Sequence, residues 1–177
     1  LEFNCRFGDP EAQVILNLLQ TEYTDLLSIM SSCQEGLPMD IRWKSGYVAN
    51  VVLSHIDYPT SKSKELINIT LDEPLEKNIT MYPSGILIKK QSKEMFTYGG
   101  RIASIVSHGK SLYKALYSVY NNIHKFRFKD KYYRRDIGLK YLCNRFQSSK
   151  KSPHLLKDVV PRKIKVAVLG STRGTSI

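Results

Sequence analysis

Between residues 41 and 107 the sequence is a succession of short apolar runs separated by turn residues such as Pro74 and Gly99. The runs cover residues 41–43, 47–54, 66–71, 79–82, 85–88, 95–98 and 101–107. Short runs rich in β-branched and aromatic residues, bounded by proline, glycine and aspartate, are typical of β-strands. The sequence therefore predicts a small antiparallel β module over residues 41–107.

A helical pattern follows the last of these runs. Ser111 is a suitable cap for a helix that extends to about Phe126. Its apolar side chains recur at helical spacing: Leu112, Ala115, Leu116, Val119, Tyr120 and Ile123. Because a sheet and a helix each need a partner to bury their apolar faces, we expect this helix to pack across the sheet with Leu116 and Val119 inward. Tyr113 and Tyr117 are interpreted as core or interface residues, and the fold class is α+β.

Two shorter helices are expected before the β module. The first runs from Pro10 to about Leu19 and carries a broad apolar stripe. The second runs from about Asp25 to Cys33 and stops before Gly36, which suits a helix end.

The first seven residues alternate apolar and polar side chains, as a β-strand does. This pattern places Glu2, Asn4 and Arg6 on one face, with the oxygens of the first two about 7 Å apart along the strand. A carboxylate and an amide oxygen can share a hard cation such as Mg²⁺, and the planar guanidinium of Arg6 can hold phosphate oxygens. The pattern alone also fits a half-exposed strand whose polar face is merely solvated.

Residues 8–11 then predict a turn into the first helix. Gly8 allows a sharp turn, Asp9 reads as the helix cap, Pro10 as the first helical residue and Glu11 as an acid in the first turn. We therefore expect the unit to be strand, turn, helix.

The charge of the chain is strongly positive. Its 177 residues include 27 Lys and Arg against 16 Asp and Glu, a formal net charge of +11. Such a balance suits nucleic acid or small phosphorylated substrates, although a run of charge is more often a solvated face. The His residues have no partner at a recognisable spacing, so His55, His108, His124 and His154 are interpreted as structural or surface groups.

The three cysteines are far apart, with no C-x-x-C pair, and indicate neither a disulfide framework nor a zinc site. No apolar stretch is long enough to span a bilayer, and no signal-peptide pattern stands at the start. These features favour a cytoplasmic protein without a membrane partner. Leu1 opens inside the predicted strand, so we expect the chain to be part of a longer protein.

The C-terminal stretch contains three successive sequence patterns. Residues 144–162 are polar and basic without a period, and predict a linker. Residues 163–169 form an apolar run of buried-strand type, and residues 170–176 follow as a Gly- and Ser/Thr-containing loop. A loop of this kind can cradle a phosphate with its backbone N–H groups.

The run from Leu1 to Glu11 resembles the signature of the phosphoribosylamine–glycine ligase (glycinamide ribonucleotide synthetase) family of ATP-grasp enzymes. The resemblance extends to about Leu142, through residues 47–54, 99–101 and 133–138, but residues 57–60 and 81–85 depart from the family pattern. It implies that Glu2 and Asn4 hold Mg²⁺ (or Mn²⁺) against ATP phosphates and that Arg6 acts in catalysis on phosphoryl oxygens. Arg134, Arg135 and Asp136 fit either a catalytic role or a buried Arg–Asp clamp that holds a chain end onto the domain.

The last strand and loop resemble the opening of glycinamide ribonucleotide formyltransferase, a family that acts on the ligase product. The resemblance implies that Gly174, Thr175 and Ser176 belong to its phosphate loop. The implied domains are the end of an ATP-grasp domain (1–36), a ligase C-terminal β-rich domain (37–143), the linker, and the start of a formyltransferase domain (163–177) fused downstream.

Together the resemblances imply a carbon–nitrogen ligase of purine synthesis that joins glycine to 5-phosphoribosylamine through a glycyl phosphate. This chain by itself is expected to be inactive, since the rest of an ATP-grasp site has no counterpart in it. The alternative is a basic β module without chemistry of its own that binds RNA or a protein partner.

Overall fold

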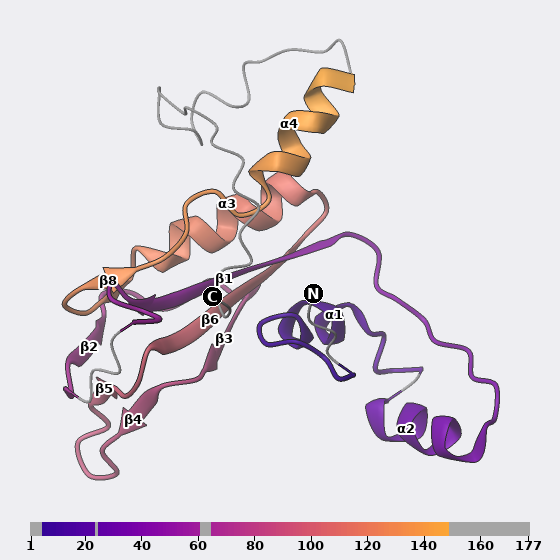
Figure 1. Ribbon diagram of the computed structural model, residues 1–177, viewed down its shortest axis with the longest axis horizontal. Helices are drawn as coiled ribbons and strands as arrows, with labels where there is room; N and C mark the ends of the chain where they lie inside the picture. Colours follow the sequence, from indigo (N-terminus) through magenta and orange to yellow (C-terminus); the bar gives the residue numbers. More distant parts are fainter. Residues whose placement is uncertain (1–4, 24, 61–64, 149–177) are drawn as a thin grey trace.

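The computed structural model describes residues 5–23, 25–60 and 65–148 (Figure 1). Its helices are α1 (Ala12–Leu18), α2 (Leu26–Glu35), α3 (Leu112–Ile123) and α4 (Leu139–Ser148). Its strands are β1 (Tyr47–His55), β2 (Asn68–Leu71), β3 (Ile79–Pro83), β4 (Ile86–Ile88), β5 (Met95–Thr97), β6 (Arg101–Gly109), β7 (Phe126–Arg127) and β8 (Lys131–Tyr132). No helix within these described ranges is long and apolar enough to cross a membrane.

The strands form two four-stranded sheets, in the orders β3-β6-β1-β8 and β4-β5-β2-β7. Every strand pair is antiparallel, and the long central pair β1 and β6 runs in register with Val51 opposite Ile105. The predicted α+β class with an antiparallel β module is thus confirmed. An observed strand overlaps each of the apolar runs 47–54, 66–71, 79–82, 85–88, 95–98 and 101–107.

Helix α3 lies along one face of the β3-β6-β1-β8 sheet and closes the core (Figure 1). Leu116 and Val119 are 2% and 0% exposed, as the helical stripe predicted. Ser111 accepts a hydrogen bond from the Lys114 N–H at 3.2 Å and caps the helix as expected. The core joins both sheets, because Ile69 and Phe126 of the second sheet pack in the same apolar cluster as Val51 and Val119.

Helix α1 lies on the other face of the same sheet, where it contacts β1 and β6 (Figure 1). Its Asn17 side chain donates a hydrogen bond to the Tyr82 hydroxyl of β3 at 2.8 Å. Just after α1, the backbone pairs with the segment before β1, where Lys44 N–H donates to Leu18 O at 2.7 Å. The run 41–43 was predicted as a strand but forms only an isolated bridge between Leu19 and Trp43, because the helix end offers it no strand to pair with.

Helix α2 stands apart from both sheets, and none of its residues is buried. It forms where the sequence placed it: Asp25 accepts a hydrogen bond from the Ser28 N–H at 2.9 Å, and Gly36 ends the helix at φ 67°. The left-handed φ at Gly36 is a conformation that glycine adopts at little cost.

Three elements after α3 were not predicted. Strands β7 and β8 cover two residues each, too few to show a period. Helix α4 begins after Gly138 and continues to Ser148, inside the range 144–162 that we predicted as a linker. The rest of that range and the predicted strand 163–169 lie outside the described residues.

Candidate functional site

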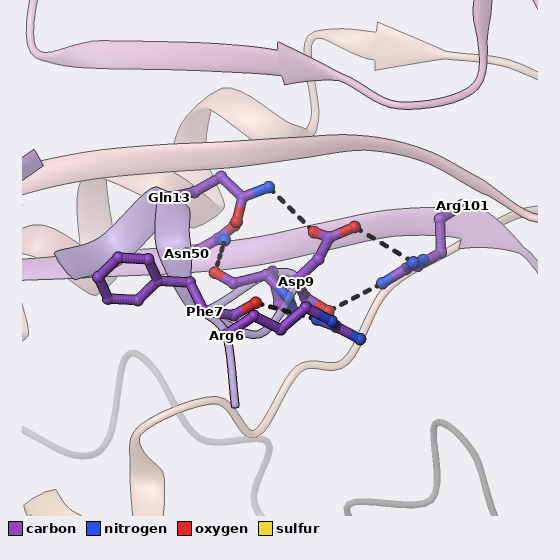
Figure 2. Close-up of polar contacts among 7 residues, drawn as sticks. Arg6, Phe7, Asp9, Gln13, Asn50 and Arg101 are labelled. Carbon is purple, nitrogen blue, oxygen red and sulfur yellow. Dashed lines mark hydrogen bonds and ion pairs between the residues drawn. The ribbon is translucent and has the colours of Figure 1, made fainter. Parts of the chain in front are cut away.

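Residues 5–11, which we call the anchored loop, are held against the sheet by Arg101 at the start of β6 (Figure 2). Arg101 Nη2 lies 3.2 Å from Asp9 Oδ2, and Arg101 Nη1 donates to the Asp9 backbone oxygen at 2.9 Å. One guanidinium therefore holds both the side chain and the backbone of the same residue. Such a two-point contact uses the planar fork of arginine, which a lysine ammonium lacks.

Two amide side chains complete the attachment of the loop (Figure 2). Asn50 of β1 donates from Nδ2 to the Pro10 backbone oxygen at 3.0 Å, and Gln13 of α1 donates from Nε2 to Asp9 Oδ1 at 2.9 Å. Their own oxygens, Asn50 Oδ1 and Gln13 Oε1, are buried and accept no hydrogen bond from any residue that the structure describes. A buried acceptor without a partner costs about 1–3 kcal/mol. These amides therefore fix where the loop lies more than they add to its stability.

The turn out of the loop differs in detail from the expected cap. The Gly8 N–H donates to Glu11 Oε2 at 2.9 Å; a Cβ at Gly8 would lie 2.8 Å from Oε2, so the Glu11 carboxylate would have to shift. Helix α1 begins at Ala12, so Pro10 and Glu11 precede it. The expectation that Asp9 caps the helix is wrong, because Arg101 and Gln13 occupy its carboxylate.

Arg6 is the one predicted ligase-site residue that lies in the described part of the chain. Its side chain is exposed, and Nη1 donates to the neighbouring Phe7 backbone oxygen at 2.9 Å. Residues 5–7 form no strand, contrary to expectation, since no strand in the described part of the chain pairs with them. The exposed guanidinium is available to an anion in solution.

The residues predicted as metal ligands and as a phosphate loop are not among those that the structure describes. Glu2 and Asn4, and Gly174, Thr175 and Ser176, lie outside the described residues. Within the described ranges, no three His, Cys, Asp or Glu side chains are grouped so that they could hold a metal ion.

A second polar arrangement holds the segment before α4. The Tyr120 hydroxyl donates to the Arg134 backbone oxygen at 2.8 Å and accepts from the Ile137 N–H at 3.2 Å. Burial raises the pKa of Tyr120 to about 12, so the phenol keeps donating at pH values where an exposed tyrosine has already ionised. Arg134 forms a two-bond pair with Asp136, at 2.9 and 2.7 Å, which holds the pKa of the Asp136 carboxyl below its usual range. The pair joins two residues of one segment and is about half exposed, at 47% and 55%, so it is not a buried clamp; the contact that holds this segment to α3 is the Tyr120 hydroxyl.

The described histidines have structural surroundings, as we interpreted them. His55 is buried beside Phe128 with Nε2 3.4 Å from Thr97 Oγ1, and His108 Nε2 lies 2.9 Å from the Ser45 backbone oxygen. Of the two alternatives for Tyr117, core or interface, the core one is wrong, because Tyr117 is 52% exposed and stacks on Tyr113; the interface alternative stays a prediction.

Sequence reasoning missed the three side chains that hold the anchored loop. Asn50 and Gln13 lie among apolar residues in the sequence. A polar residue in such a pattern is usually interpreted as facing solvent. Arg101 was noticed only as part of the Gly99-Gly100-Arg101 resemblance. Its partner Asp9 lies 92 positions earlier, a pairing that no local pattern encodes.

Several known proteins resemble this chain in sequence or in structure. The family described as "Phosphoribosylglycinamide synthetase, C domain" matches residues 48–140. A protein from Dictyostelium discoideum named "Bifunctional purine biosynthetic protein purD" is 38% identical over 145 residues, which are 80% of this chain and 17% of that protein. A phosphoribosylamine–glycine ligase from Halalkalibacterium halodurans is 34% identical over 149 residues, which are 84% of this chain and 33% of that protein.

Among solved structures, a phosphoribosylamine–glycine ligase from Thermotoga maritima superimposes with a TM-score of 0.62 at 29% identity. The match covers 77% of this chain and 32% of that one. The chain thus spans about a third or less of the length of these relatives.

Proposed function

The chain belongs to the phosphoribosylamine–glycine ligase family through its C domain, and from this membership we propose that the complete protein joins glycine to 5-phosphoribosylamine. In the proposed reaction ATP activates the glycine carboxylate as glycyl phosphate. The amine of phosphoribosylamine then attacks the acyl carbon, phosphate leaves, and glycinamide ribonucleotide forms. We place the protein in de novo purine synthesis in the cytoplasm.

The observation that carries the proposal is the family match over residues 48–140. The anchored loop is attached to that matched region, because Asn50 and Arg101 both lie within it. Arg6 therefore stands on the C domain with its guanidinium exposed. We assign to it the stabilisation of phosphoryl oxygens as charge develops on them.

The proposed cofactors are ATP and Mg²⁺ (or Mn²⁺). One carboxylate and one amide oxygen, from Glu2 and Asn4, are the ligand types that Mg²⁺ takes in proteins. A bound Mg²⁺ would neutralise charge on the ATP phosphates. The chain's own contribution is to present these oxygens and the Arg6 guanidinium from one short segment.

A chimeric enzyme tests the proposal. The matching third of the Halalkalibacterium halodurans ligase would be replaced by this chain, and ADP release measured with ATP, Mg²⁺, glycine and freshly made phosphoribosylamine. We expect ADP release that requires both glycine and phosphoribosylamine. Glu2→Ala should lower turnover about 10²-fold or more, on the scale of losing a preorganised charge contact, while Glu22→Ala serves as the matched control. A folded chimera without activity would contradict the proposal.

We further propose that a formyltransferase domain is fused downstream, with Gly174, Thr175 and Ser176 in its phosphate loop. The name of the Dictyostelium discoideum relative, a bifunctional purine biosynthetic protein, supports a fusion of this kind. By itself this chain should release no ADP, because binding ATP and glycine in reactive geometry, which supplies roughly 7–11 kcal/mol of a barrier, needs more residues than it carries.

The net charge of +11 supports a second candidate, a basic module that binds RNA or a protein partner without chemistry. Binding to unrelated RNA that weakens steeply with salt and ignores ATP would favour it. We expect only weak binding of this kind, because the cationic side chains that the structure describes are dispersed and several are paired with carboxylates.

A further inference from the structure

We propose that Arg101 is a positioning residue of the ligase, which sets the orientation of the anchored loop and thereby of Arg6 toward the phosphoryl group. This inference rests on the proposed function. It adds a role for a side chain that lies outside the predicted metal and phosphate ligands.

The contacts of Arg101 fix an orientation as well as a place. Its guanidinium holds Asp9 Oδ2 at 3.2 Å and the Asp9 backbone oxygen at 2.9 Å. A residue held by side chain and backbone together cannot rotate about its own axis without breaking one contact. The direction in which the chain leaves Asp9 toward Arg6 is therefore set by β6.

Donors from three separate elements converge on two consecutive residues. Arg101 of β6 and Gln13 of α1 bind Asp9, and Asn50 of β1 binds Pro10 (Figure 2). Arg6 is three residues upstream of Asp9, which is at most about 10–11 Å of chain. A displacement at Asp9 is consequently transmitted to Arg6 over a short path.

The loop has little apolar attachment of its own. Phe7 is 49% exposed, and Cys5, Arg6 and Asp9 are exposed as well. The ion pair is also partly exposed, with side chains 37% and 47% accessible for Arg101 and Asp9. Pairs this exposed add little to folding stability. Loss of Arg101 should therefore change the geometry of the loop while leaving the domain folded.

Hydrogen exchange on the chain itself tests the docking. We expect Arg101→Gln to accelerate amide exchange in peptides covering residues 5–17 about 3- to 10-fold, the range expected for a partly exposed pair. Peptides covering α3 should be unchanged. The matched control is Arg127→Gln, which removes a long-range Arg–Asp pair with Asp72 in the other sheet. Equal exchange in wild type and Arg101→Gln would overturn the proposal.

Kinetics of the chimeric ligase test the positioning role. Arg101→Gln should lower kcat about 10-fold or more with a much smaller change in the KM for glycine, because a misplaced group weakens the transition state more than the ground state. Asp9→Asn should lower kcat less, because the bond from Arg101 to the Asp9 backbone oxygen remains. The double variant should be no worse than Arg101→Gln alone, since that change already removes both contacts. Arg101→Lys should recover only part of kcat, because it restores the charge without the fork.

The outcomes separate the two proposals. If the wild-type chimera is active and Arg101→Gln has the same kcat, the positioning role is overturned. The proposed function would then still stand. A folded wild-type chimera without activity would contradict the proposed function, and the positioning role would fall with it.

Discussion

The two faces of the β3-β6-β1-β8 sheet are covered in different ways. Under α3 the contacts are apolar and fully buried, with Val51, Leu53, Ile105 and Val119 at 0–1% exposure. On the opposite face α1 and the anchored loop are attached by Asn17, Asn50 and other polar side chains. The α3 face is held chiefly by apolar burial, whereas the α1 face combines directed hydrogen bonds with some buried residues, such as Val106 of β6 at 2% exposure.

The two kinds of contact have different consequences: one determines the stability of the domain, and the other determines the orientation of a segment on it. Apolar burial has no preferred direction and supplies most of the folding free energy. Hydrogen bonds and ion pairs contribute less, but their geometry specifies how a segment lies. We infer that the α3 face keeps the domain folded, while the α1 face sets the position of the anchored loop, which carries Arg6.

The largest expected effect comes from the α3 face. Leu116→Ala should lower the free energy of unfolding by about 2–5 kcal/mol, because the removed atoms leave a cavity under α3. Urea denaturation followed by circular dichroism measures this. Leu27→Ala is the matched control, because Leu27 of α2 is 76% exposed and its truncation should change stability by less than about 0.5 kcal/mol. Equal losses in the two variants would show that α3 does not close the core.

A polar contact on the α3 side should have an intermediate effect. Tyr120→Phe removes the hydroxyl that serves both Arg134 O and the Ile137 N–H, and should lower stability by about 1–3 kcal/mol. The exposed Tyr117 provides the same substitution as a control, with an expected change within about 0.5 kcal/mol. If Tyr120→Phe were as neutral as Tyr117→Phe, the hydroxyl would not hold the segment before α4.

The ionisation of Tyr120 gives a pH-dependent form of the same test. The folded-state pKa is raised from 10.0 to about 12, chiefly by burial. Its contribution to stability is therefore complete below pH 10 and is lost as pH rises toward 12, because the unfolded state releases the proton first. Tyrosinate absorbance should show a late-titrating group that is absent from Tyr120→Phe. A titration finished near pH 10 would contradict this.

The smallest effect on stability is expected on the α1 face. Arg101→Gln should change the free energy of unfolding by no more than about 1 kcal/mol, since the Asp9 pair is partly exposed. Thermal unfolding measures it, with Arg127→Gln as the comparison. A loss as large as that of Leu116→Ala would mean that the loop contacts stabilise the domain, and the division between the two faces would be wrong.

Much of the fold could be predicted because its determinants are local. The stripe containing Leu116 and Val119 encodes a buried face directly, and Asp25 and Gly36 mark the ends of a helix within their own neighbourhood. Strands β7 and β8 could not be found this way, because two residues carry no period.

The candidate site was only partly accessible from sequence. The roles of Arg6, Glu2 and Asn4, expected from the alternating pattern and from the resemblance, all stay predictions. The cap assigned to Asp9 was wrong for a physical reason: an Asp before a proline matches a helix cap, but a guanidinium from β6 competes for the carboxylate. Tertiary partners decide the use of a polar side chain, and Arg101 is too far along the chain to be seen.

Trp43 has a practical consequence that follows from its place. It is the sole tryptophan of the chain, it is 51% exposed, and its backbone forms a bridge with Leu19 directly after α1. Its fluorescence therefore reports on the segment directly after α1, while the far-ultraviolet signal averages over all helices and strands. Emission that shifts at lower urea than ellipticity would reveal release of the N-terminal segment ahead of global unfolding. The protein thus contains an intrinsic optical probe for the part of the molecule that carries Arg6.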